Sequence, residues 1–326
     1  MSRPRLSVVV PCFNEQEVLA ETAARLQSLL ESLVQAGKID ATSNVWFVDD
    51  GSRDKTWEII ERLCKESHCI RGVKLSKNRG HQQALVAGLF CADGEAVVSI
   101  DADLQDDVAV IEHMIDRHRE GADVVFGVRK SREKDTFFKR QTAEVFYRLM
   151  NWLGAESIRH HADFRLMSRR AVEAFASYRE VNLFLRGIIP TLGFRTAIVE
   201  YDRGDRFAGT SKYPLRKMIA FALEGITSFS VTPLRMITAT GFLVFAATLV
   251  MTAWVLWARF FTGEAVPGWA STVLPLYFVG GVQILCLGVM GEYLGKIYTE
   301  VKARPRYLIE AMAGVPAEGS APASYG

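Results

Sequence analysis

Two aspartates and a glutamine occupy alternate positions, Asp101, Asp103 and Gln105, directly after the apolar run 96–100. The apolar run predicts a buried strand that leads into the acidic segment. In an extended chain, residues two apart point to the same face, so the three side chains are predicted to point the same way. Their oxygens suit Mg²⁺ or Mn²⁺, which commonly bridge protein carboxylates and phosphate groups.

The two acids that follow, Asp106 and Asp107, have a plainer explanation. An acidic turn at the start of a helix caps free backbone N–H groups and complements the helix dipole. Both residues are therefore predicted to cap the helix that begins near residue 108. The same alternative applies to His81 and Gln82, which could line a ligand pocket or cap the helix that they begin.

Strands and helices that would position these residues alternate along the first 130 residues. Apolar runs at 6–10, 45–48, 72–75, 96–100 and 123–126 predict strands, and helical periodicity covers 15–36, 80–92 and 108–119, with a further helix from about 54. This alternation predicts an α/β fold with a doubly wound, mostly parallel sheet. Ligands of such sheets bind at the carboxyl ends of the strands, where the polar clusters of this chain lie.

The usual phosphate-binding loops are missing from this sheet. The first strand continues into Pro11-Cys-Phe-Asn14-Glu15 with no Gly-x-Gly-x-x-Gly, and the chain contains no Walker-type loop. A nucleotide bound here would need a metal to neutralise its phosphates. A second phosphate site is predicted in the segment 203–213, which gathers arginine, lysine and hydroxyl side chains around glycines.

Composition excludes several other classes of protein. The chain has 326 residues, enough for two domains, and a formal charge of +2, so no basic excess indicates nucleic-acid binding. Its five cysteines are too scattered for a disulfide framework or a zinc site.

Two uncharged runs, 237–257 and 272–291, predict a pair of transmembrane helices, because about 20 apolar residues cross the hydrocarbon layer. Basic residues flank the pair, whereas the connecting loop at about 258–271 has one arginine and one glutamate, which predicts cytoplasmic termini and an external loop. The expected organisation is a catalytic domain (1–213), interfacial helices (214–235), the membrane pair (236–295) and a C-terminal tail (296–326). Such a pair also suggests a homo-oligomer.

Taken together, the motifs resemble glycosyltransferase family 2, in particular the polyprenyl-phosphate glycosyltransferases of bacteria with two C-terminal membrane helices. The segments that carry the resemblance cover nearly the whole chain: Ser7-Val-Val-Val-Pro11-Cys-Phe-Asn14-Glu15, Val48-Asp49-Asp50-Gly51-Ser52, Asn78-Arg-Gly80-His81-Gln82, Asp101-Ala-Asp103-Leu-Gln105-Asp106, His161-Ala-Asp163-Phe-Arg165 and Gly209-Thr-Ser211-Lys212-Tyr213. One departure is Thr210, where relatives often have glutamate.

The resemblance implies a GT-A fold at the bacterial inner membrane, a nucleotide-diphosphate sugar donor, a divalent metal and a polyprenyl phosphate acceptor. Carried over by position, the metal residues are Asp101, Asp103 and Gln105, and the donor residues are Pro11, Asn14, Glu15, Asp50 and Asp101. The candidates for the acceptor phosphate are Arg129, Arg206, Ser211 and Lys212, and the catalytic residues are Asp103, Asp163 and Lys212. Asp163 would be either a base or a residue that orients Arg165 or another cation.

The expected reaction is inverting transfer of a hexose, with UDP-glucose as the first choice of donor and GDP-mannose, UDP-GlcNAc and UDP-aminoarabinose as alternatives. A processive polysaccharide synthase is disfavoured because its Gln-x-x-Arg-Trp signature is absent. The competing class is a non-catalytic membrane scaffold that binds nucleotide sugars.

Overall fold

The structure, a computed structural model, describes residues 3–129, 161–180, 185–202, 232–257, 261 and 269–315. The chain divides into two compact units. The first unit comprises residues 1–143, 157–213 and 303–326, and the second comprises residues 144–156 and 214–302.

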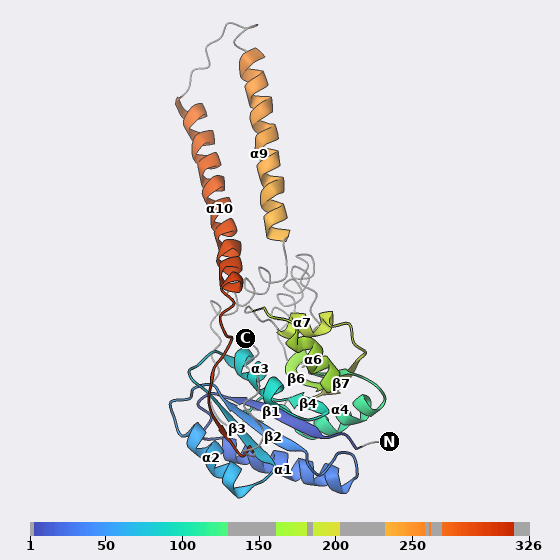
Figure 1. Ribbon diagram of the computed structural model, residues 1–326. Coiled ribbons are helices and arrows are strands. Elements are labelled where there is room, and N and C mark those ends of the chain that lie inside the picture. Colours follow the sequence, from blue (N-terminus) through green and yellow to red (C-terminus); the bar gives the residue numbers. More distant parts are fainter. Residues whose placement is uncertain are drawn as a thin grey trace. The chain divides into compact units, whose positions relative to one another are not determined.

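The first unit is built on an eight-stranded sheet in the order β7-β5-β6-β4-β1-β2-β3-β8 (Figure 1). The strands are β1 (Leu6–Cys12), β2 (Asn44–Asp49), β3 (Ile70–Leu75), β4 (Ala96–Ser99), β5 (Val124–Arg129), β6 (His161–Ser168), β7 (Thr196–Tyr201) and β8 (Ile309–Ala313). Strands β4, β1, β2 and β3 run parallel, as do β5 and β7, whereas β6 and β8 pair antiparallel with their neighbours. The sheet is therefore mostly parallel, as predicted.

Helices cover both faces of this sheet. Side chains of α1 (Leu19–Gln35), α2 (Thr56–Glu66) and α4 (Val110–Arg119) share one hydrophobic core with inward residues of the strands. The other face carries α3 (His81–Cys91) and α6 (Arg169–Ala176), whose Phe90 and Phe175 rings lie 5.7 Å apart. A Cβ on Gly88 of α3 would lie 2.3 Å from Val9 Cγ1, so glycine allows α3 to lie close against the central strands.

The five strands predicted for the first 130 residues are confirmed, and β1, β2 and β4 are buried along their whole length. Residues 161–180 and 185–202, for which no strand or helix was predicted above, form β6, α6, α7 (Leu185–Thr191) and β7. The segment after residue 302, expected to be part of a tail, contributes β8 to the edge of the sheet next to β3. Residues 214–231 of the predicted interfacial segment 214–235 lie outside the described residues, and residues 232–235 belong to the helix Thr232–Trp257.

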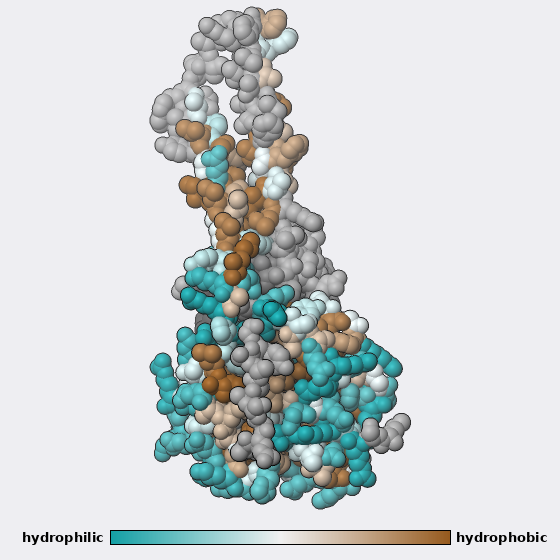
Figure 2. Space-filling view, viewed as in Figure 1, coloured by the Kyte–Doolittle hydropathy of each residue, from teal (hydrophilic) through white to brown (hydrophobic). Residues whose placement is uncertain are grey.

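The second unit contains two long helices that lie side by side, α9 (Thr232–Trp257) and α10 (Trp269–Val301) (Figure 1). Their described side chains form a largely hydrophobic surface (Figure 2), with exposed residues such as Phe242, Trp254, Phe278 and Leu287. Among the described residues, one stretch, Phe278–Val301, is long and apolar enough to cross a membrane. This stretch overlaps the predicted span 272–291, and the span predicted at 237–257 stays a prediction.

Candidate active site at the carboxyl ends of the strands

The acidic segment is a turn, and the prediction that it is extended is wrong. Strand β4 ends at Ser99, and Leu104 adopts φ +56°, in the left-handed region that reverses the chain direction. Asp101 and Asp103 are half-buried, whereas Gln105 is only 6% exposed and lines a cavity of about 290 Å³ with Arg25 and Asp202. The three predicted metal residues therefore do not form a row on one face of a strand.

The acids that follow have different partners from each other. The Asp107 carboxylate accepts a hydrogen bond from the Ala109 N–H (2.9 Å), so its predicted role as a cap before α4 is confirmed. Asp106 is 3% exposed and accepts a hydrogen bond from the Tyr201 hydroxyl (2.6 Å) at the end of β7. This contact joins Asp106 to a strand that is distant in sequence, and its predicted role as a helix cap stays a prediction.

Asp101 faces α3 and β6. The Nε2 atom of His81 lies 3.5 Å from Asp101 Oδ1 and 3.7 Å from Asp163 Oδ2, so the imidazole bridges the two acids. Burial raises the pKa of Asp101; the His81 ring offsets this in part, whereas the nearby carboxylates add to it. The His81 side chain therefore contacts two of the predicted site acids, and its role in lining a ligand pocket stays a prediction.

Asp163 lies between two guanidinium groups. The Nη2 of Arg165 donates to Asp163 Oδ1 (2.6 Å), and the Nη2 of Arg186 in α7 donates to Oδ2 (3.2 Å). Burial alone would raise the pKa of this carboxyl, but the charges of Arg165 and Arg186, with His81, hold it well below its usual range. Arg165 is itself 1% exposed, which makes Asp163 the compensating charge for a buried cation.

Asp50 forms a second part of the site at the end of β2. Its carboxylate accepts hydrogen bonds from the backbone N–H groups of Arg79 (2.7 Å) and Gly80 (2.8 Å), and Gly80 has a positive φ of +91°, which favours glycine. Burial raises the pKa of Asp50, and the two N–H groups act against that effect. The Asp50 carboxylate therefore fixes the loop that ends at Gly80, immediately before His81, the first residue of α3.

The first polar loop is held against the loop after β2. The N–H of Asn14 donates to Ser52 Oγ (2.9 Å), Asn14 Oδ1 accepts from the Arg53 N–H (2.9 Å), and the N–H of Glu15 donates to Thr56 Oγ1 (2.9 Å). Asn14 has φ +57°, a conformation that asparagine tolerates better than most residues. Pro11 is buried in β1 next to this loop.

Several predicted residues are thus brought to one end of the sheet. Asp101 and Asp163 meet around His81, and Asp50 holds the loop that carries His81. The predicted phosphate residues Arg206, Ser211 and Lys212, and the side chain of Arg129, lie outside the described part of the structure. Sequence reasoning missed Arg186, which stands in an arginine-rich stretch without a distinguishing pattern.

The oxygen donors of the acidic turn fit a divalent cation only if substrate oxygens complete the shell. Within the described residues, no three His, Cys, Asp or Glu side chains converge as a ready-made metal site. Mg²⁺ sites at phosphates commonly use one or two carboxylates, with the remaining ligands from phosphate and water. Asp101 and Asp103 meet that requirement, since both are half-buried acids on one turn.

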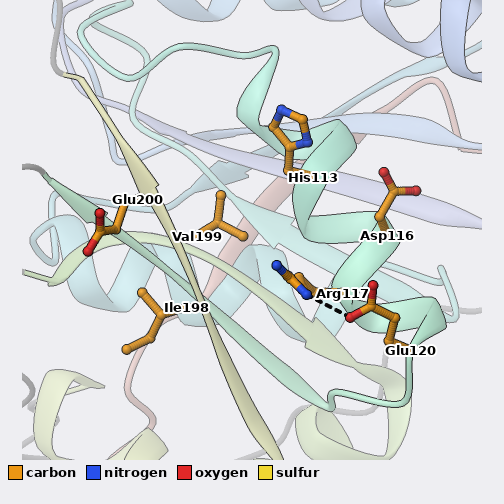
Figure 3. A pocket seen from close by; sticks show the side chains of 7 residues that line it. All are labelled: His113, Asp116, Arg117, Glu120, Ile198, Val199 and Glu200. Carbon is orange, nitrogen blue, oxygen red and sulfur yellow. Dashed lines mark hydrogen bonds and ion pairs between the residues drawn. The ribbon is translucent and has the colours of Figure 1, made fainter.

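A separate hollow of about 350 Å³ lies between α4 and the edge strand β7 (Figure 3). Two of its charged residues pair with each other, Arg117 Nη1 and Glu120 (2.9 Å), and Asp116 pairs with Lys38 outside the hollow (2.7 Å). His113 is exposed at its rim. None of the residues that line this hollow belongs to the acidic turn 101–107.

A mostly parallel α/β sheet with carboxylates at the carboxyl ends of its strands defines the class of doubly wound α/β proteins that bind ligands at this edge. Comparison with known proteins gives the family. The model for "Glycosyl transferase family 2" matches residues 7–175. The chain belongs to glycosyltransferase family 2, with the GT-A type of α/β fold, as the motifs predicted.

Relatives match along almost the entire chain. "Uncharacterized glycosyltransferase YkoT" of Bacillus subtilis is 49% identical over 311 residues, covering 95% of this chain and 92% of that protein. The "SfII prophage-derived bactoprenol glucosyl transferase" of Shigella flexneri is 41% identical, covering 94% and 97%. The "Prophage bactoprenol glucosyl transferase homolog" of Escherichia coli is 40% identical, covering 94% and 98%.

Proposed function

We propose that this glycosyltransferase moves a hexose from a nucleotide-diphosphate sugar, with UDP-glucose as first choice, to the phosphate of undecaprenyl phosphate, with inversion at the anomeric carbon. The observation that carries the proposal is similarity over 94% of the chain to proteins named bactoprenol glucosyl transferases. The convergence of Asp101, His81 and Asp163 at the carboxyl ends of the strands supports it.

In the proposed reaction, a phosphate oxygen of the lipid attacks C1 of the sugar while the bond from C1 to the donor diphosphate breaks. The products are a lipid-linked sugar and the nucleoside diphosphate. A divalent cation held by Asp101 and Asp103, with Gln105 nearby, would supply Lewis-acid stabilisation of the departing diphosphate. Pro11, Asn14, Glu15 and Asp50 form the loops proposed to bind the nucleotide.

The acceptor needs no strong base. The second pKa of a phosphate monoester is about 6, so the lipid phosphate is largely a dianion near neutral pH. The harder task is to hold two anionic substrates together, which cations can do. Arg129, Arg206, Ser211 and Lys212 are proposed to bind the acceptor phosphate, and Asp163 is proposed to act as a permanent anion that orients Arg165 and Arg186.

The direct test is transfer by the purified full chain in detergent. Radiolabelled UDP-glucose, Mg²⁺ or Mn²⁺ and undecaprenyl phosphate should give a radiolabelled lipid, and parallel reactions with GDP-mannose, UDP-GlcNAc and UDP-aminoarabinose identify the sugar. Asp103→Asn should abolish transfer while leaving the melting temperature unchanged. No transfer from any of these donors would overturn the enzyme assignment in favour of a non-catalytic nucleotide-sugar scaffold.

Lys212 provides a sharper test of the acceptor site. Lys212→Ala should raise the KM for undecaprenyl phosphate by about tenfold or more and leave the KM for the donor little changed, because a charge-assisted contact to phosphate is lost. A larger effect on the donor KM than on the lipid KM would refute this role.

The helical unit is proposed to cross the cytoplasmic membrane twice, through α9 and α10, with the catalytic unit in the cytoplasm. Apolar side chains exposed along both helices support this placement. A single cysteine introduced in the loop 258–271 of a variant lacking the native cysteines should react with a membrane-impermeant maleimide in intact cells. A cysteine placed at exposed Glu31 should react only after lysis; the opposite pattern would reverse the topology.

A further inference from the structure

The acidic turn is held from the α1 and α4 face of the sheet by two residues far from it in sequence. Tyr201, at the end of β7, donates its hydroxyl hydrogen bond to Asp106 (2.6 Å), and both residues are 3% exposed. The hydroxyl of Thr22 in α1, 2% exposed, lies 2.9 Å from the Ala102 carbonyl oxygen. Asp101, in contrast, faces His81 and Asp163 from the α3 side.

These contacts have a specific conformation to maintain. Leu104 adopts φ +56°, which costs a leucine on the order of 1 kcal/mol and persists only where surrounding contacts impose it. Asp103 and Gln105 flank that residue, and the Gln105 N–H donates to Asp103 Oδ1 (3.2 Å). The contacts of Asp106 with Tyr201 and of Ala102 with Thr22 oppose relaxation of the Leu104 backbone to negative φ, which would move Asp103 and Gln105.

The Asp106–Tyr201 bond is suited to act as such a restraint. A buried carboxylate loses its hydration and depends on the hydrogen bonds that it accepts, and an O–H···O⁻ bond of this length is of the strong, charge-assisted kind. The Tyr201 ring is fixed independently, because it packs edge-to-face on Phe164 with centroids 5.4 Å apart. Phe164 stands between Asp163 and Arg165 in β6, so one tyrosine joins the acidic turn to the strand that carries the arginine-bound acid.

We propose that Tyr201, through its hydrogen bond to Asp106, is a positioning residue that sets the acidic turn in its cation-binding conformation. This inference rests on the proposed function, in which Asp101 and Asp103 of that turn hold the divalent cation. Outer contacts that orient metal ligands commonly affect metal affinity or activity by 10- to about 100-fold when removed.

The test measures cation binding apart from catalysis. Binding of Mn²⁺ to the full chain in the presence of UDP, without acceptor, is followed by electron paramagnetic resonance, and UDP binding without metal is measured by calorimetry. Tyr201→Phe removes only the hydroxyl and keeps the ring on Phe164; it should weaken Mn²⁺ binding on the order of tenfold and leave metal-free UDP binding and the melting temperature near wild type. Tyr178→Phe, a hydroxyl deletion outside the turn and its contacts, should change neither.

Variants of the partner residue complete the test. Asp106→Asn keeps an oxygen that accepts from Tyr201 and should bind Mn²⁺ more tightly than Asp106→Ala, whereas Tyr201→Phe added to Asp106→Ala should cause no further loss. Wild-type Mn²⁺ affinity in Tyr201→Phe, or independent losses in the double variant, would overturn the positioning role and leave the proposed function intact. A wild-type chain whose UDP binding does not involve Mn²⁺ would overturn the metal assignment and this inference with it.

Discussion

At the scale of single residues, the charge state of Asp163 separates its two predicted roles. A carboxylate beside two guanidinium groups is stabilised as the anion, and the pKa of Asp163 is held well below its usual range despite burial. Such a group is a weak proton acceptor near neutral pH. Because the proposed acceptor, a lipid phosphate, is already anionic, orientation of Arg165 and Arg186 is the role that this geometry favours.

This reasoning predicts the pH dependence of the reaction. A depressed pKa keeps Asp163 ionised from neutral pH to below pH 4, so the fall in kcat/KM for the lipid below about pH 6 should come from protonation of the lipid phosphate. Asp163→Asn should therefore retain that acidic limb and raise the lipid KM more than it lowers kcat. Steady-state rates from pH 5 to 8 measure both effects, and loss of the limb in this variant would restore the base role.

At the scale of elements, strands could be predicted from the sequence where an uninterrupted run of buried apolar residues forms the strand. The cores of strands β1, β2, β4 and β5 are apolar runs. Strand β6 contains Asp163 and Arg165, whose charges hide a strand in the sequence because each compensates the other only after folding. Strand β7 lies at the edge and alternates exposed and buried residues. The turn at Leu104 could not be predicted, since a leucine gives no local signal for positive φ and the Asp106 partner lies 95 positions away.

The junction of β5, β6 and α6 gives a prediction about stability. Asp123, before β5, accepts a hydrogen bond from Ser168 Oγ (2.9 Å), the N-cap of α6, and forms an ion pair with Arg170. The Arg170 guanidinium, followed by Ser168, lowers the pKa of Asp123 against the effect of burial. A carboxyl whose pKa is lowered by folding stabilises the native state above its unfolded pKa of about 3.9, and this contribution is lost as pH falls through the folded pKa.

Asp123→Asn should accordingly lower the melting temperature at pH 7 by a few °C, corresponding to about 1 kcal/mol, because it keeps the shape and acceptor but removes the charge. The difference from wild type should shrink as pH is lowered below 4. Thermal unfolding of the detergent-solubilised chain across that range measures it, with Glu31→Gln on the exposed surface of α1 as the matched charge removal. A difference independent of pH would show that the ion pair contributes nothing.

At the scale of the whole molecule, the chain leaves the sheet-containing unit near residue 213 and returns to it at residue 303. On its return it forms β8, which pairs with β3 in the register Gly72↔Ala313 to Leu75↔Ile309. An ion pair between Lys74 and Glu310 (2.9 Å) joins residues 236 positions apart. The sequence predicts a tail here because β8 has only five residues and its partner β3 precedes both long helices. A segment this short has no local pattern that indicates a strand.

Deletion of β8 should therefore affect the catalytic unit and not only the end of the chain. Truncation after Lys302 removes the strand and the Leu308 carbonyl that accepts from the Ser76 N–H (2.9 Å), leaving the backbone of β3 unpaired at the sheet edge. Unpaired edges promote association with other chains, so this variant should show a lower melting temperature and aggregation on size-exclusion chromatography in detergent. Truncation after Val315 keeps β8 intact and should behave as wild type in both measurements. If the two truncations were equally stable and equally monodisperse, β8 would be dispensable and the catalytic unit would be complete before the helical unit begins.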